Sequence, residues 1–197
     1  MRAKVLSVFS LAIMLAGCSD GVAGKPVPVT GASPSETSSG SVPKVSRPLD
    51  VSRFEKEPCA ALVPGQLAEF GITRQPNSMP GDALGPSCTW NGLDEGGVTV
   101  GARLLVGGSL AGLYKRHEQG GLPHFEPVAD ISGYPGVLTD LLDAQPQGKC
   151  SAEVAVSDDR LYSVQVTISR NSEDYANPCP VAKKAAEMAV STMKAGA

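Results

Sequence analysis

The stretch SAEVAVSDDRLYSVQVTI, residues 151–168, predicts the fold more strongly than any other part of the chain. It contains two runs in which apolar and polar side chains alternate, separated by the turn-forming residues 158–160. Alternation with a period of two residues is typical of a strand with one buried and one solvated face. We therefore expect an antiparallel hairpin whose buried side chains are Ala152, Val154, Val156, Tyr162, Val164, Val166 and Ile168.

The segments around this hairpin predict further strands of the same sheet. Residues 88–90, 98–106 and 137–138 have strand character, and so do residues 125–128. Pro127 has no backbone N–H to donate, so we expect the 125–128 strand at an edge or in an irregular pairing. The many turn-forming residues of 77–86 predict a loop.

Three segments have helical character. Residues 64–70 begin with a proline, residues 110–118 follow the capping residue Ser109, and Asn177 is expected to cap a last helix that has Pro178 at its first position. An alanine-rich stripe on that last helix predicts close packing on the sheet. The expected fold is α+β, with a mainly antiparallel, twisted sheet of about five strands, helices packed largely on one face, and two disulfides.

Four cysteines lie in the folded part of the chain, at Cys59, Cys88, Cys150 and Cys179. An even number in an exported domain predicts two disulfides, and no CxxC or HxxxH pair predicts a zinc site. Three connectivities are possible. We favour Cys59–Cys88 with Cys150–Cys179, because each pair joins the start of a helix to the start of a strand and closes a loop of similar length.

The N-terminal segment has the anatomy of a lipoprotein signal. Arg2 and Lys4 precede an apolar run that is too short for a membrane-spanning helix, which needs roughly 20 apolar residues. The run ends in Leu-Ala-Gly-Cys at residues 15–18, a lipobox that predicts cleavage before Cys18 and attachment of diacylglycerol, with palmitate among the acyl chains. The two acyl chains of a diacylglycerol are enough to anchor a protein stably at a membrane. A chance cysteine after an ordinary secretory signal is the alternative.

Composition divides the chain into three parts. Residues 1–17 are the expected signal peptide, residues 18–47 a lipidated tether, and residues 48–197 a single α+β domain. The tether is rich in Ser, Gly, Pro and Thr and has no aromatic residue, so it predicts disorder. Without residues 1–17, 15 basic and 20 acidic side chains remain, and this acidic balance argues against a nucleic acid partner.

Several short motifs follow one another in a characteristic order. After the lipobox and the polar tether come Pro58-Cys59, Cys88-Thr89-Trp90, Phe125-x-Pro127-Val128, Gly133-Tyr134-Pro135 and Asn177-Pro178-Cys179. Together they resemble the actinobacterial lipoproteins grouped as domain of unknown function 3558, over nearly the whole mature domain. Val63-Pro64-Gly65 departs from the Thr-Pro-Glu that is usual in that family. The resemblance implies an exported, disulfide-bonded α+β domain and carries no activity with it.

Catalytic motifs are weak in this sequence. Residues 107–111, Gly-Gly-Ser-Leu-Ala, nearly match the G-x-S-x-G nucleophile elbow, so a cell-envelope hydrolase that uses Ser109 with His117 or His124 is an alternative. A capping role explains Ser109 equally well, and neither histidine has a recognisable triad spacing. No D-x-D-x-D-G calcium loop is present. We therefore expect no enzyme activity, no cofactor and no metal.

Trp90, Tyr134 and Tyr162 have two interpretations. Trp90 stands beside a cysteine, and core packing is the favoured role for all three rings. Exposed on one sheet face, they would instead form a platform for a glycan or a peptide.

These observations predict a non-catalytic binding module on the outer face of the cytoplasmic membrane. The membrane holds it through the lipid anchor, and its partner is an envelope protein, a wall component or a lipid. A deep apolar cavity would favour the lipid, and an exposed apolar patch would favour the protein partner.

Overall fold

The structure is a computed structural model that describes residues 41–95, 97–140 and 142–196. The expected signal peptide, the lipidation site Cys18 and most of the expected tether lie outside these residues. Within the described residues, no helix is both long enough and apolar enough to cross a membrane.

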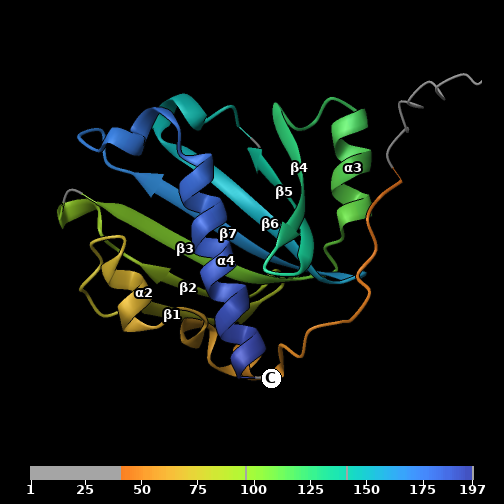
Figure 1. Cartoon of the computed structure of the whole chain (residues 1–197), viewed down its shortest axis with the longest axis horizontal. Helices are drawn as coiled ribbons and strands as arrows, with labels where there is room; N and C mark the ends of the chain where they lie inside the picture. Colours follow the sequence, from red (N-terminus) through yellow and green to blue (C-terminus); the bar gives the residue numbers. More distant parts are fainter. Residues whose placement is uncertain (1–40, 96, 141, 197) are drawn as a thin grey trace, which may run out of the picture. The chain divides into compact units, whose positions relative to one another are not determined.

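Seven antiparallel strands form one sheet in the order β1-β2-β3-β7-β6-β5-β4 (Figure 1). The 151–168 hairpin is confirmed and lies near its centre as β6 and β7. The strands are β1 (Asn77–Asp82), β2 (Gly85–Trp90), β3 (Val98–Val106), β4 (His124–Ile131), β5 (Tyr134–Asp140), β6 (Lys149–Ser157) and β7 (Arg160–Ile168).

The expected number of about five strands is wrong. The main cause is β1, which occupies the segment predicted as a loop and pairs with β2 along the sheet edge. All six of its residues are exposed, so it has no apolar alternation that reveals a strand. Its pairing shifts register between Met79 and Asp82. The expectation for Pro127 is confirmed, because β4 is the other edge strand.

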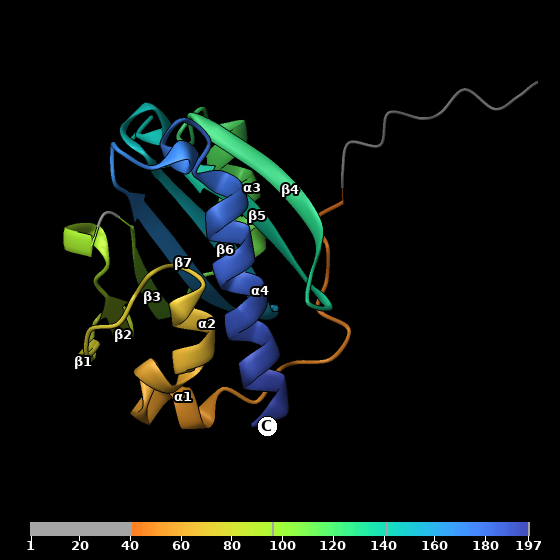
Figure 2. The same cartoon turned by 60° about the vertical axis from the view of Figure 1, so that its left-hand side comes forward.

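One face of the sheet is packed against α4 (Cys179–Ala195) (Figure 2). The inward side of this helix is mostly alanine, which lets the helix axis come close to the strands beneath it. The strand residues on this face form fully buried cross-strand rows such as Trp90–Val100–Val166–Cys150. The helix contributes Ala182, Ala185, Ala186, Ala189, Val190 and Met193 to the same core.

The short helices at the start of the domain extend the same layer. They are α1 (Ser52–Lys56), the 3-10 turn η1 (Pro58–Ala61) and α2 (Pro64–Ala68). Phe54 and Leu67 join the α4-side core, and Gln66 Nε2 donates to the Met188 carbonyl of α4 at 3.1 Å. No side-chain hydroxyl caps α2, but Gln66 Oε1 accepts from the Val63 N–H at 2.9 Å. Short 3-10 turns also occur at η2 (Leu93–Glu95), η3 (Gln145–Gln147) and η4 (Glu173–Ala176).

The helix α3 (Leu110–Glu118) lies on the opposite face of the sheet. Leu110 packs there in a second, smaller core with Val137, Ala155 and Leu161. The expected placement of the helices largely on one face therefore holds for α1, α2 and α4 and is wrong for α3. The apolar stripe of α3 packs on odd-numbered residues of β5, β6 and β7, whose side chains point away from α4.

The predicted cap of the last helix is also wrong. Pro178 occupies the N-cap position of α4, and no side chain caps that end. Asn177 instead ends the preceding turn, where its backbone N–H donates to the Asp174 carbonyl at 3.0 Å. The Ser109 cap is confirmed, because its hydroxyl accepts from the Gly112 N–H at 3.2 Å.

Residues 42–47, at the end of the expected tether, lie against the domain. Val42 and Val45 pack on the α3-side core. The Val45 N–H donates to Asp158 Oδ1 at 3.0 Å, and the Leu49 N–H donates to the Val156 carbonyl at 2.9 Å. The packed part of the chain thus includes residues before Pro48, where the sequence placed the start of the domain.

Candidate functional site

The two disulfides pair Cys59 with Cys88 and Cys150 with Cys179, the connectivity favoured from the sequence. Each joins residues 29 apart in the chain. Cys88 and Cys150 both project from the α4 face of the sheet, and each fastens a helical segment to that face. In the chain-entropy model a loop of this length contributes about 3–4 kcal/mol to stability.

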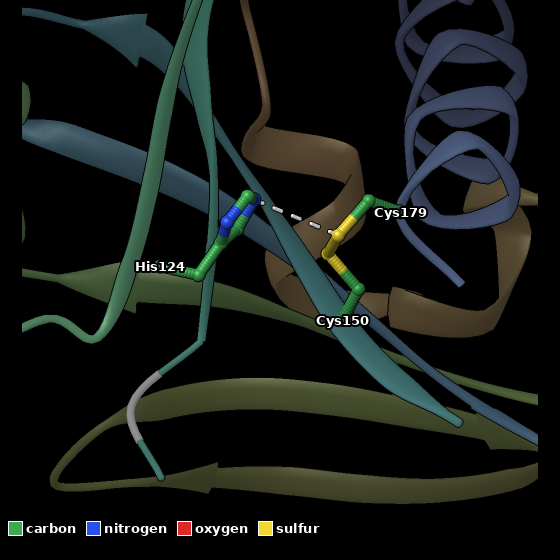
Figure 3. Close-up of side chains that lie close together, drawn as sticks. All are labelled: His124, Cys150 and Cys179. Carbon is green, nitrogen blue, oxygen red and sulfur yellow. Dashed lines mark hydrogen bonds between the residues drawn. A yellow bond between two sulfur atoms is a disulfide. The ribbon is translucent and has the colours of Figure 1, made fainter. Parts of the chain in front are cut away.

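His124 lies beside the second disulfide (Figure 3). Its Nε2 atom is 3.7 Å from Cys179 Sγ, and Gln145 Nε2 donates to the same sulfur at 3.2 Å. Cys150 and Cys179 are buried, with 2% and 6% of their surface exposed. One ligand atom from each of His124, Cys150 and Cys179 lies within 4.8 Å of the others, a spacing compatible with a metal ion once the sulfurs are thiolates.

The predicted 125–128 strand stops short of His124, and no sequence pattern connects this residue with the cysteines. It is the first residue of β4, whose alternation puts it on the same face as Glu126 and Val128, toward α4. If the predicted 125–128 strand had begun one residue earlier, its alternation would have placed His124 on the same face as Glu126 and Val128. The neighbouring Phe125 points to the other face, where it stacks on His117 of α3 with ring centroids 4.3 Å apart.

The face of the sheet away from α4 is polar wherever α3 does not cover it. Strand register aligns Ser87, Arg103, Ser163 and Glu153 in one cross-strand row. It aligns Thr89, Gly101, Gln165 and Ser151 in the next row. These two rows line a hollow of about 260 Å³.

A second hollow of about 470 Å³ continues from the first and shares Ser151 and Gln165 with it. Its lining also includes the basic Arg116 and Lys149, the acidic Asp140 and the apolar Leu142 and Ala144. We call the two hollows together the polar groove. It runs across the uncovered strands toward the C-terminal end of α3.

Glu153 is a buried carboxyl in the wall of the polar groove. Only 9% of its surface is exposed, and its Oε1 atom accepts from the Ser163 hydroxyl at 2.9 Å. The Oε2 atom is buried and has no hydrogen-bond partner among the described residues. Burial raises the pKa of Glu153 to about 7, and the Ser163 hydrogen bond opposes this rise.

Arg103 does not neutralise Glu153. Its Nη1 atom pairs with Asp82 Oδ1 and donates to the Gly85 carbonyl, both at 2.7 Å, at the edge of the sheet. Gly101 lies two residues before Arg103 on the same face of the sheet. A Cβ atom added at Gly101 would have the Gln165 carbonyl oxygen as its nearest neighbour, at 3.9 Å. The missing side chain therefore leaves open space in the floor of the groove.

The residues of the hydrolase alternative are not brought together. Ser109 lies at the N-terminus of α3 and accepts its capping hydrogen bond, while His117 lies eight residues further along, about 12 Å at the rise of a helix. His124 points to the other face of the sheet, toward Cys179. In the described part of the chain, no hydrogen bond joins Ser109 to either histidine.

All three aromatic residues left open by the sequence are buried. Trp90 has no exposed surface, and Tyr162 and Tyr134 have 3% and 7%. Burial also raises the pKa of the Tyr162 hydroxyl. Core packing is the correct interpretation, and these rings form no exposed platform.

Comparison with known families decides the membership of the chain. The model of the family described as protein of unknown function (DUF3558) matches residues 13–192. The chain belongs to this family. The DUF3558 match covers every strand and nearly all of α4, so it includes both disulfides and the polar groove. No curated protein and no solved structure matches the chain.

Proposed function

We propose that this DUF3558 member is a lipoprotein of the cell envelope, like the actinobacterial lipoproteins that its motifs resemble. We propose further that it acts as a non-catalytic binding module. The lipobox at residues 15–18 supports export and lipidation at Cys18, and the residues that follow supply a tether. The membrane contact is the lipid anchor, on the outer face of the cytoplasmic membrane. Disulfides are typical of proteins that fold outside the cytoplasm.

The observation that carries the binding role is the polar groove with the Glu153 carboxyl in its wall. The solvated face of an antiparallel sheet carries polar side chains, and these need not leave a hollow. Here Ser151 and Ser163 have short side chains and Gly101 has none, so a hollow remains beside the longer Gln165. Burying the Glu153 carboxyl is costly, and a buried titratable group with a shifted pKa in the wall of a hollow is typical of functional sites.

The lining of the groove favours a wall polymer as the ligand. Hydroxyl, amide and carboxyl groups of the first hollow provide hydrogen bonds, and Leu142 and Ala144 add apolar surface in the second, whereas a lipid requires a deep apolar cavity. The two hollows are continuous, so they accept an extended polar chain better than a compact molecule. A wall glycan or its attached peptide has this character.

A sedimentation assay with insoluble cell-wall polymer tests the binding role. Gly101→Leu fills the floor of the groove without backbone strain and should weaken binding at least tenfold. The matched control is Thr167→Leu, which adds a similar side chain to the same sheet face outside the groove lining. Failure of the wild-type protein to sediment with the wall, or equal binding by Gly101→Leu, would contradict the proposal.

The anchor needs its own test. The Cys18→Ala protein should incorporate no labelled palmitate and should appear in the medium, while the wild type stays with the membrane. Labelling that persists in Cys18→Ala, or release of the wild type, would contradict lipidation at Cys18.

A further inference from the structure

The His124–Cys150–Cys179 cluster has the donor set of a zinc site. Two thiolates and an imidazole are ligands that Zn²⁺ takes in proteins, with a fourth position for water or an oxygen. Zn–S and Zn–N bonds of about 2.3 and 2.0 Å in a tetrahedral site place sulfur and nitrogen about 3.5 Å apart. The observed separation between Cys179 Sγ and His124 Nε2 is 3.7 Å. In the disulfide form this pair is therefore close to the distance that one zinc ion requires, and the Cys150 sulfur has to move away from Cys179 before a metal ion can bind.

Three separate elements hold the three ligands. His124 begins β4, Cys150 lies on β6, and Cys179 is the first residue of α4 (Figure 3). Strand pairing holds the backbones of His124 and Cys150, and the packing of α4 on the sheet holds that of Cys179. The site requires the two cysteine side chains to rotate apart in the dithiol state, which opens the space between the two sulfurs.

The surroundings favour thiolates at this position. Cys179 stands at the N-terminus of a 17-residue helix, where the macrodipole stabilises negative charge. Gln145 donates a hydrogen bond to its sulfur. Glu126 Oε2, on a largely exposed side chain, is 4.0 Å from His124 Nε2. The Cys59–Cys88 pair has no histidine in a comparable position among the described residues.

We propose that His124, Cys150 and Cys179 form a Zn²⁺ site in the dithiol state of the protein, which precedes disulfide formation. Two thiols release their protons to solvent, and the two thiolates and the neutral imidazole donate electron pairs to the metal. No electron is transferred. The disulfide and the metal ion use the same sulfurs, so they exclude one another. This site is separate from the polar groove and does not depend on the proposed function.

Cobalt titration of the reduced full-length chain tests the proposal. All samples carry Cys18→Ala and are reduced with a water-soluble phosphine, which takes up oxygen from water as it converts each disulfide to two thiols. One equivalent of Co²⁺ should produce thiolate-to-cobalt charge-transfer absorption, and Zn²⁺ should abolish it. Two protons should be released for each metal ion bound.

The second cysteine pair supplies the matched control. Cys59→Ser with Cys88→Ser should keep the cobalt absorption, and Cys150→Ser with Cys179→Ser should lose it. His124→Ala should weaken binding at least tenfold. Absorption that requires Cys59 and Cys88, or equal affinity in His124→Ala, would overturn the proposal.

If reduction of the disulfides unfolds the chain, the β-sheet signal in circular dichroism provides the test. Zn²⁺ should then restore the β-sheet signal, and it should do so in the Cys59→Ser, Cys88→Ser protein but not in His124→Ala. A reduced chain whose sheet signal and absorption do not respond to either metal also overturns the proposal.

Discussion

The two faces of the sheet differ although the same strands build both. On the α4 face every central position is apolar, and Trp90, Val100, Val164 and Val166 have no exposed surface. On the other face α3 covers the apolar positions of one end, and hydroxyl, amide and carboxyl groups line the rest. The difference teaches that one face of this sheet holds the fold together, while the other has room for a ligand.

The largest effect should come from the α4 face. We predict that Trp90→Ala lowers the free energy of unfolding by about 3–5 kcal/mol, because it removes a large, fully buried ring. Gln165→Ala, on the opposite face, should change it by no more than about 0.5 kcal/mol. Urea unfolding measures both. Similar losses in the two variants would contradict the division between a structural face and an open face.

The smaller core under α3 should contribute less. Leu110 has 3% of its surface exposed and anchors α3 to the sheet. We predict that Leu110→Ala costs about 2–3 kcal/mol and speeds amide exchange in 110–118 more than in β7. The exposed Lys115→Ala on the same helix serves as the control. Equal loss of protection in β7 would show that α3 and the central sheet unfold as one unit.

Glu153 should make stability depend on pH. Its pKa is about 7 in the folded protein and near 4.5 in the unfolded chain, so the folded state binds more protons between these values. The stability that Glu153 contributes is then fully present below about pH 4.5 and is lost as pH rises through 7. We predict a loss of about 2 kcal/mol between pH 5 and pH 8.

Glu153→Gln should remove most of this slope, whereas Glu118→Gln, at an exposed position, should leave it unchanged. Urea unfolding at several pH values measures the slope. A wild-type stability that rises over this range while Glu153→Gln stays on the same curve would contradict the burial of an unpaired carboxyl.

The smallest effect should come from the cap of α3. Ser109→Ala removes the hydroxyl that accepts from the Gly112 N–H and should cost about 1 kcal/mol. Ser109→Thr keeps an acceptor and should restore most of the loss. Thermal unfolding distinguishes the variants. If Ser109→Ala leaves stability unchanged, the cap contributes nothing and the helix is held by Leu110 alone.

Much of the fold was predictable because several elements carry strong local patterns. The 151–168 hairpin alternates over its whole length and forms β6 and β7 as expected. The same logic found β3 and the helix α3 with its Ser109 cap. The fully exposed β1 was missed, since its six residues bury nothing and leave no alternation to detect.

The candidate sites were less predictable than the fold. His124 and Cys179 are 55 residues apart, so no local spacing indicates that they meet. Glu153 was expected on a solvated face. In the sheet it lies between Val137 of β5 and Ser163 of β7, and its carboxyl is buried there. Nothing in the sequence around Gly101 indicates a binding site. Its role can be inferred only from its position in the floor of the groove.

The sequence by itself determined the hairpin, the buried alternation on the central strands and the supply of four cysteines. These properties follow from patterns with periods of two or 3.6 residues, which act within one element. The tertiary structure alone decided that α3 lies opposite α4, that His124 approaches Cys179, and that Glu153 is enclosed. Those placements depend on strand order and register, which bring distant residues together and are set by the packing of the whole sheet.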